Sequence, residues 1–175
     1  NLHVEANGLQ SIKSVVFAGA VALGAGKLGI GAAGSGVDAI NKIAGTISAY
    51  IDGSSATNKV ISADAITVKA TDNSSIRAVG GAAAVAAGFG MTGVAISVGV
   101  SLAKNTIETA VNAEILNMKG AVSRVTATQD INVLAHNQAV INATSAAAAL
   151  AISAGVFALS LSGAGAFAEN IISSS

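Results

Sequence analysis

The chain lacks cysteine, proline and tryptophan altogether. Without cysteine there is no disulfide, no thiolate metal ligand and no cysteine nucleophile. The absence of proline suits strands whose backbone amides donate hydrogen bonds to neighbouring strands on both sides. Charged residues make up only 10% of the chain, and nine basic residues balance nine acidic ones without forming clusters. We therefore expect no nucleic-acid partner, because no basic surface is present to attract phosphates.

Aromatic residues are also scarce, at 3%, although 52% of the chain is hydrophobic. The apolar mass is therefore alanine, valine and isoleucine, accompanied by 20 glycines, and small side chains of this kind pack sheets closely. No basic segment followed by an apolar core opens the chain, so any export signal is expected outside it. Because the chain begins and ends within a repeat, we expect it to be part of a longer array.

One pattern occurs three times along the chain, at an offset of 64 and then 65 residues. A fixed period of this length is typical of proteins in which each unit buries its apolar surface against the next one. The offsets divide the sequence into repeat 1 (1–65), repeat 2 (66–130) and a partial repeat 3 (131–175). The same shifts align eight triples: Val4, Val68 and Val133; Ala6, Ala70 and Ala135; Ile12, Ile76 and Ile141; Ala18, Ala82 and Ala147; Ala20, Ala84 and Ala149; Ala22, Ala86 and Ala151; Gly26, Gly90 and Gly155; Asn41, Asn105 and Asn170.

Small and large residues alternate along much of each repeat. In repeat 2 the small residues from Gly93 to Ala103 interleave with larger ones from Val94 to Leu102. This period of two predicts strands with one small and one β-branched face, because a helix would mix the two sets. Glycine-rich segments at 24–29 and 88–93 separate two such strands in each repeat and predict a hairpin or a sharp corner.

The remainder of each repeat is shorter and more polar. Half-exposed strands are predicted around 43–51 and 107–115, followed by turns at 52–55 and 117–120 and short strands around Val60 and Val122. The motif Ile66-Thr67-Val68-Lys69-Ala70 closes the unit. The predicted fold is all-β: an elongated repeat array resembling a β-solenoid or β-helix, with long Gly/Ala-rich strand hairpins and 64–65 residues per repeat.

Two long uncharged runs raise the alternative of a membrane protein. The 26 residues between Arg77 and Lys104 and the 30 between Gln138 and Glu169 are long enough for a spanning helix. The abundant glycine, the period of two and Lys27 in the first copy argue against a helix. A pair of membrane strands is the closer rival, since each arm has the required length of about 10 residues. The small face, however, favours a dry contact between two sheets over a polar lumen, and we do not expect the membrane to be a partner.

A family resemblance rests on three short motifs. The string Ile47-Ser48-Ala49-Tyr50-Ile51-Asp52-Gly53-Ser54 is followed by Ile66–Ala70, and then by Ile76-Arg77-Ala78 before a Gly/Ala-rich run that ends at Asn105. This order resembles the repeats of large secreted bacterial surface proteins, the filamentous-haemagglutinin-like and leukotoxin-like filamentous adhesins. The resemblance implies export across the outer membrane, location at the bacterial cell surface, a β-solenoid stalk, and a role in adhesion, biofilm or self-association.

Candidate catalytic groups are few and do not recur. None of the carboxylates or arginines is present in all three copies, and solvated turns account for each; the set is Asp52, Asp64, Asp72, Asp130, Arg77 and Arg124. His3 and His136 do not occupy equivalent positions, and the glycine-rich Ca²⁺-binding turn of secreted repeats is absent. We therefore expect no enzyme, no cofactor and no dedicated metal site.

Asparagine is the one polar residue that all three copies share at an equivalent position, as Asn41, Asn105 and Asn170. Stacked amides hydrogen-bond to one another along β structures, whereas a ligand contact would need other polar groups nearby. We predict a structural role for the row.

Two classes of function remain. The favoured one is a structural or adhesive repeat of an extracellular filament or stalk, with neighbouring repeats, other copies and an unknown cell-surface ligand as partners. The alternative is a membrane-inserting or pore-forming pair of strands. Exposed strand edges at the ends of the array would allow chains to join into fibres.

Overall fold

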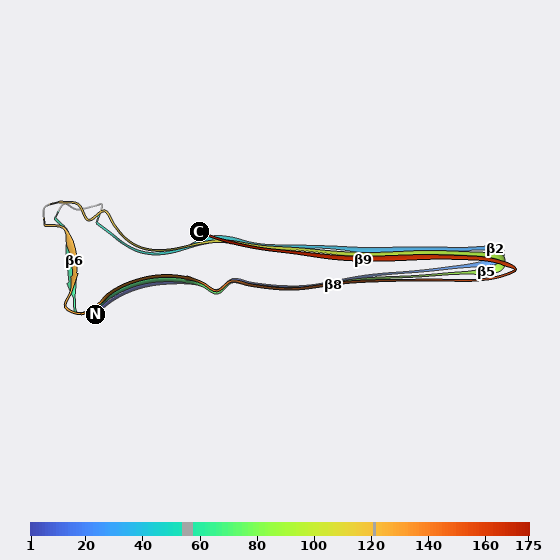
Figure 1. Cartoon of the computed structure of the whole chain (residues 1–175), viewed down its shortest axis with the longest axis horizontal. Helices are drawn as coiled ribbons and strands as arrows, with labels where there is room; N and C mark the ends of the chain where they lie inside the picture. Colours follow the sequence, from blue (N-terminus) through green and yellow to red (C-terminus); the bar gives the residue numbers. More distant parts are fainter. Residues whose placement is uncertain (54–57, 121) are drawn as a thin grey trace.

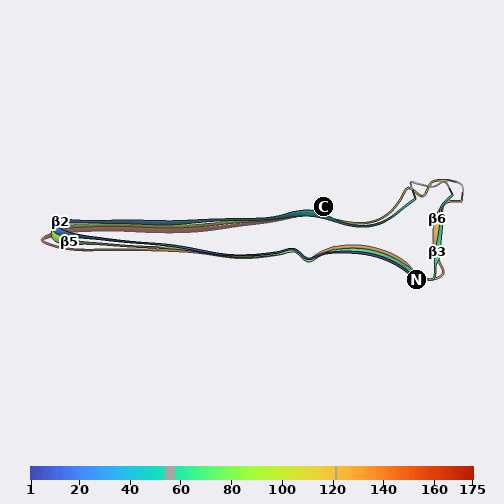
Figure 2. The ribbon, with the colours of Figure 1, turned by 180° about the vertical axis from the view of Figure 1, so that it is seen from behind.

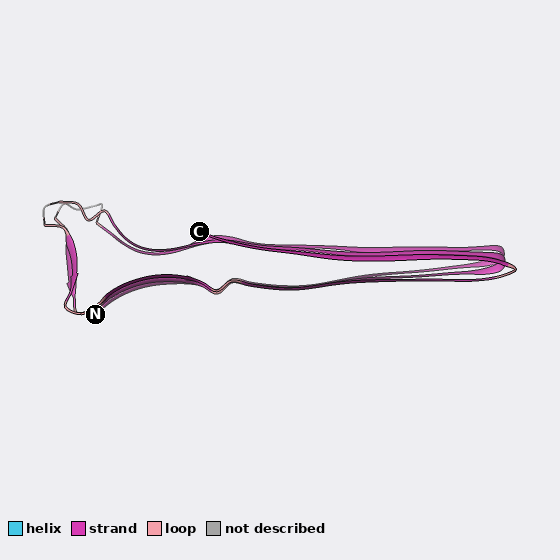
Figure 3. Ribbon diagram, viewed as in Figure 1, coloured by secondary structure: helices cyan, strands magenta, loops and turns pink. Residues whose placement is uncertain are grey.

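The computed structural model describes residues 1–53, 58–120 and 122–175, and within them it is all-β, with no helix (Figure 3). Short strands frame one end of each copy, and very long strands fill the rest. The nine strands are β1 (Leu2–Gly8), β2 (Ser11–Asp52), β3 (Val60–Ala63), β4 (Ile66–Asp72), β5 (Ser75–Leu116), β6 (Arg124–Ala127), β7 (Ile131–Asn137), β8 (Val140–Ala154) and β9 (Phe157–Ser174).

Each strand pairs in parallel with the equivalent strand of the next copy. The sheet orders are β1-β4-β7, β2-β5 followed by β8 and β9, and β3-β6. Ala18 lies opposite Ala82, which lies opposite Ala147, so the register follows the offsets found in the sequence. The copies consequently overlie one another, three deep as far as the end of β9 and two deep beyond it (Figure 1).

The offset changes from 64 to 65 at one corner. Ala63 still pairs with Ala127, whereas Ile66 pairs with Ile131. The added residue therefore lies between β6 and β7, where 128–130 replace 64–65. Every later row keeps the new offset, so the insertion changes the corner and leaves the strands in register.

The long strands reverse direction at their glycine-rich segments. Figures 1 and 2 show two arms that leave the short strands, run side by side and meet at a distant tip. The hydrogen-bonded ladder continues through this corner, so that 11–52 form one strand where the sequence predicts two arm strands and a further half-exposed strand around 43–51. The arms of one copy do not pair as a hairpin, because the ladders of β2 and β5 run to neighbouring copies. The prediction of strand hairpins is wrong in this respect, and the predicted sharp corner is confirmed.

We call the two-layered part of the arms the blade, comprising residues 14–39, 78–103 and 143–168. Its layers face each other through small side chains, and Ser97 Oγ donates a hydrogen bond to the carbonyl of Ala84 across the gap (2.8 Å). A Cβ added to Gly99 would lie 2.6 Å from the carbonyl oxygen of Ala148, and one added to Gly31 would overlap the backbone of Ala87. Only glycine fits at these positions, because the backbones of the two layers approach so closely.

We call the other end the base, comprising the short strands and the last quarter of β2 and β5. Its core consists mainly of branched aliphatic residues from β2, β4 and β5, with Ile66 and Val68 fully buried against Ile47, Ile51 and Val111. A second cluster centred on Ile76 and Ile107 lies where the arms leave the base. The short strand predicted around Val122 begins two residues later, at Arg124, and the turn predicted at 52–55 extends beyond the described residues.

The described residues contain no helix long and apolar enough to cross a membrane. The uncharged run from 78 to 103 lies within β5. The alternative of a spanning helix is therefore wrong.

Candidate functional site

The three equivalent asparagines form a row across β2, β5 and β9, next to the row of Ile43, Ile107 and Ile172 at the inner end of the blade. The side-chain amide of Asn41 donates to Asn105 Oδ1 (2.8 Å), and the amide of Asn105 donates to Asn170 Oδ1 (2.9 Å). Asn105 is fully buried and Asn41 nearly so, whereas Asn170 on the outermost strand is exposed. Asn105 thus both accepts and donates along the direction in which the copies stack, which satisfies a buried amide that burial would otherwise penalise. The structural role predicted for the row agrees with this geometry and stays a prediction.

A second polar row lies at the corner after β4 and β7. The prediction of a solvated turn is wrong for Asp72, which is fully buried. Its Oδ1 accepts hydrogen bonds from the backbone amide (3.0 Å) and hydroxyl (2.5 Å) of Ser74. Its Oδ2 has no hydrogen-bond partner among the described residues. In the next copy the equivalent Asn137 donates to both Thr109 Oγ1 and Ser174 Oγ (3.0 Å each).

Glycine replaces a hydroxyl beside Asp72. Gly45, Thr109 and Ser174 are equivalent positions, and Asn137 bonds the last two. By the same register Asp72 faces the pair Gly45 and Thr109. The unpaired carboxylate oxygen therefore marks a departure from the repeat, and the sequence alone did not reveal it.

The remaining candidate groups are spread over the coil. Asp52 accepts a hydrogen bond from the Asn117 amide (2.9 Å) at the end of β2, and Asp64 accepts one from Thr128 Oγ1 (3.2 Å) at the corner after β3. Asp130, His3 and His136 are exposed. Across the described residues no three His, Cys, Asp or Glu side chains are grouped so as to hold a metal ion. Arg77 lies on an arm in β5, and Arg124 lies on β6.

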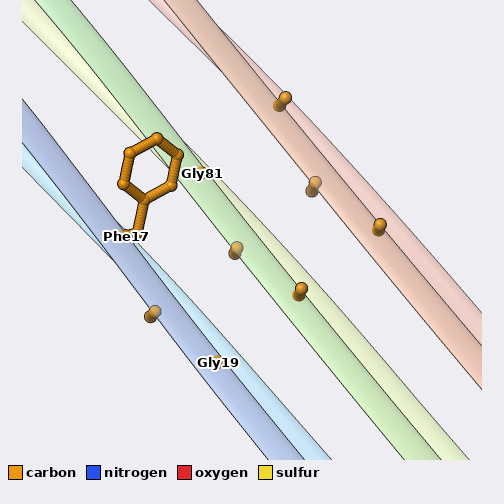
Figure 4. A pocket seen from close by; sticks show the side chains of 9 residues that line it. Phe17, Gly19 and Gly81 are labelled. Atoms are coloured by element: carbon orange, nitrogen blue, oxygen red, sulfur yellow. The ribbon is translucent and has the colours of Figure 1, made fainter.

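The outer faces of the blade carry a different kind of surface, made of exposed apolar residues. One face has a shallow groove of about 450 Å³ with the Phe17 ring at one end, lying over Gly81 (Figure 4). The groove exists because the residues beside Phe17 in the equivalent rows are small: Gly19, Gly81, Ala83, Ala146 and Ala148. The alternation of small and large residues predicts such a face, but the row-by-row comparison of copies is needed to find its grooves.

Ion pairs mark where the apolar surface ends. On the second arm Lys104 pairs with Glu169 (3.2 Å) and Lys42 with Glu108 (2.7 Å), in each case between neighbouring copies. These pairs are half exposed, so their contribution to stability is small. They keep the part of the arm closest to the base hydrated.

The chain matches no family model, and neither a curated protein nor a solved structure is significantly similar to it.

Proposed function

We propose that the chain is a β-solenoid segment that serves as a structural and adhesive repeat in an extracellular filament or stalk. The observation that carries the proposal is the long parallel ladder between β2 and β5. Residues 11–26 pair with 75–90, and residues 28–52 pair with 92–116. A ladder of this kind adds one coil on another without limit, and each coil contacts only its neighbours. Such an assembly is suited to length and stiffness more than to enclosing a substrate.

The composition of the interior supports the same proposal. The asparagine row bonds along the stacking direction, and Ser97 bonds the facing layer, so these inner polar groups are satisfied by the protein itself. Attachment would then come from surfaces that recur with each copy. Location at the bacterial cell surface is part of this proposal and follows from the family resemblance.

The competing proposal is a membrane-inserting or pore-forming segment, favoured by the exposed apolar residues of the blade. In a bilayer, however, the outermost strands β2, β8 and β9 would each present an edge with unpaired backbone groups to lipid. Each such group costs several kcal/mol in hydrocarbon, which is why open sheets do not span membranes. The stalk therefore accounts better for this architecture.

Hydrogen exchange on the purified chain in buffer without detergent tests the proposal. A stalk requires β5 to be protected along its whole length, including 78–103 in the blade, and its far-ultraviolet circular dichroism to show β structure that vesicles do not alter. Rapid exchange in the blade, or β structure that forms only with vesicles, would contradict the stalk and favour membrane insertion.

A further inference from the structure

The outer faces of the blade stay exposed even where the copies flank each other. In the middle strand β5, which has a neighbour on both sides, Ile96, Val98, Val100 and Leu102 remain 41, 47, 40 and 40% exposed. Stacking further copies adds strands at the edges of the sheet and cannot cover these side chains. Only another body that lies against the face can remove them from water.

The face of the second arm has a relief that alternates from strand to strand. Val98 and Val100 project from β5, while the paired positions are glycines on both neighbours: Gly34 and Gly36 on β2, and Gly163 and Gly165 on β9. An added Cβ would meet no atom within 4 Å at Gly34, Gly163 or Gly165. We call the two valines the valine ridge and the four glycines the glycine furrows.

A ridge with a furrow on each side is complementary to a copy of itself. When two such faces meet about a two-fold axis and are displaced by one strand, about 4.8 Å, each valine ridge lies over a glycine furrow of the other chain. A contact of this kind is isologous and closes as a dimer. The matching of the two surfaces points to a second copy of this chain as the partner.

The size of the face agrees with this partner. Rows 28–38 across three strands measure about 33 Å by about 14 Å, or roughly 500 Å² per chain. Two faces together bury roughly 1,000 Å², which is the lower bound for a specific interface. The face carries one charge among its described residues, Asp38 at its inner limit, and the ion pairs of Lys104 and Lys42 lie beyond it.

We propose that the blade is a homotypic docking element, which pairs laterally with the blade of a second copy through the valine ridge and the glycine furrows. The inference rests on the proposed structural and adhesive role, and it assigns a surface to the self-association that the family resemblance implies. Lateral pairing uses the faces of the sheet, whereas end-to-end joining uses the strand edges, so the two can be separated experimentally.

Sedimentation equilibrium of the full chain over a range of concentrations tests the pairing. We expect the wild-type chain to dimerise and the double variant Gly34→Lys with Gly163→Lys to weaken dimerisation at least tenfold, because the valine ridge can lie over either furrow and charged side chains would fill both. Gly19→Lys is the matched control, since Gly19 lies on the first arm, also with no atom within 4 Å of an added Cβ, and it should leave the dimer unchanged. Circular dichroism of each variant verifies that the fold is retained.

Three results would overturn the proposal: a wild-type chain that stays monomeric at millimolar concentration, an equal effect of the two lysine variants, or a monomer that floats with phosphatidylcholine–phosphatidylglycerol vesicles. The last would assign the face to lipid. Failure of the stalk is recognised separately, because it would appear as rapid hydrogen exchange in β5 whether or not the dimer forms.

Discussion

The base and the blade are built from the same strands but are held together in different ways. In the base, Ile66, Val68 and Ile107 are fully buried among other branched side chains. In the blade, the buried residues are mostly alanine, serine and glycine, with Val37 as a buried larger residue, and most large residues point to solvent. The base is therefore stabilised by burial of apolar area, whereas the blade depends on close backbone approach and on the ladders between copies. The difference shows that the same long strands can bury their large hydrophobic residues in the base and expose them to solvent in the blade.

The largest expected effect is in the base. Ile66→Ala removes a fully buried side chain from the main core and should lower the free energy of unfolding by about 2–5 kcal/mol. Ile96→Ala truncates a half-exposed residue on the blade and should cost less than about 1 kcal/mol. Urea titrations followed by circular dichroism, at concentrations where the chain is monomeric, measure both. Equal losses would mean that the blade has a core of its own.

The blade should be more sensitive to added atoms than to removed ones. Gly99→Ala places a methyl group 2.6 Å from the Ala148 carbonyl oxygen and should destabilise the chain by up to about 3 kcal/mol. Gly34→Ala, on the outer face with no atom within 4 Å, should be neutral or stabilise by several tenths of a kcal/mol. Thermal unfolding of the two variants provides the comparison. Equal melting temperatures would contradict the close contact between the layers.

Between the two regions, the asparagine row should contribute stability without contributing binding. Asn105→Ala removes two amide hydrogen bonds and leaves both neighbours with one unpaired group, a loss of about 2 kcal/mol. The variant should melt earlier than the wild type and keep its self-association and any cell attachment. Loss of attachment at an unchanged melting temperature would instead identify the row as a ligand site.

The last substitution should stabilise the chain. Asp72→Asn keeps the oxygen that accepts from Ser74 and replaces the unpaired buried oxygen with a donor, so we expect a gain of about 1 kcal/mol. Asn137→Asp is the reciprocal control and should destabilise the chain, because it removes the donor to Thr109 and Ser174. A loss of stability in Asp72→Asn would show that the carboxylate has a role of its own.

Much of the strand register followed from the sequence because the copies align without gaps over long stretches. Ile12, Ile76 and Ile141 lie opposite one another as their spacing predicts. The period of two also separated small from large faces in β5. It did not say what each face meets, since a small face packs equally well against a sheet of another chain or of the same copy. In the structure the arms pair between copies and do not form hairpins. Periodicity alone cannot distinguish these two kinds of pairing.

Features of single rows were harder to foresee. Gly45 stands where the later copies carry Thr109 and Ser174, and it is distant in sequence from Asp72 and belongs to the preceding copy. The valine ridge depends on glycines that lie 64 and 65 residues away from it. Residues 64 or 65 positions apart lie opposite one another on neighbouring strands, so such features depend on comparing these equivalent positions of the copies.

The single residue added between β6 and β7 has an evolutionary consequence. Because the strands on either side keep their register, a change of length at this corner does not propagate along the coil. A gene for such a protein can therefore gain or lose codons at the corners while selection acts on the rows. Diversity in this architecture is expected to accumulate as corner insertions and outward-facing substitutions, with the inner rows changing most slowly.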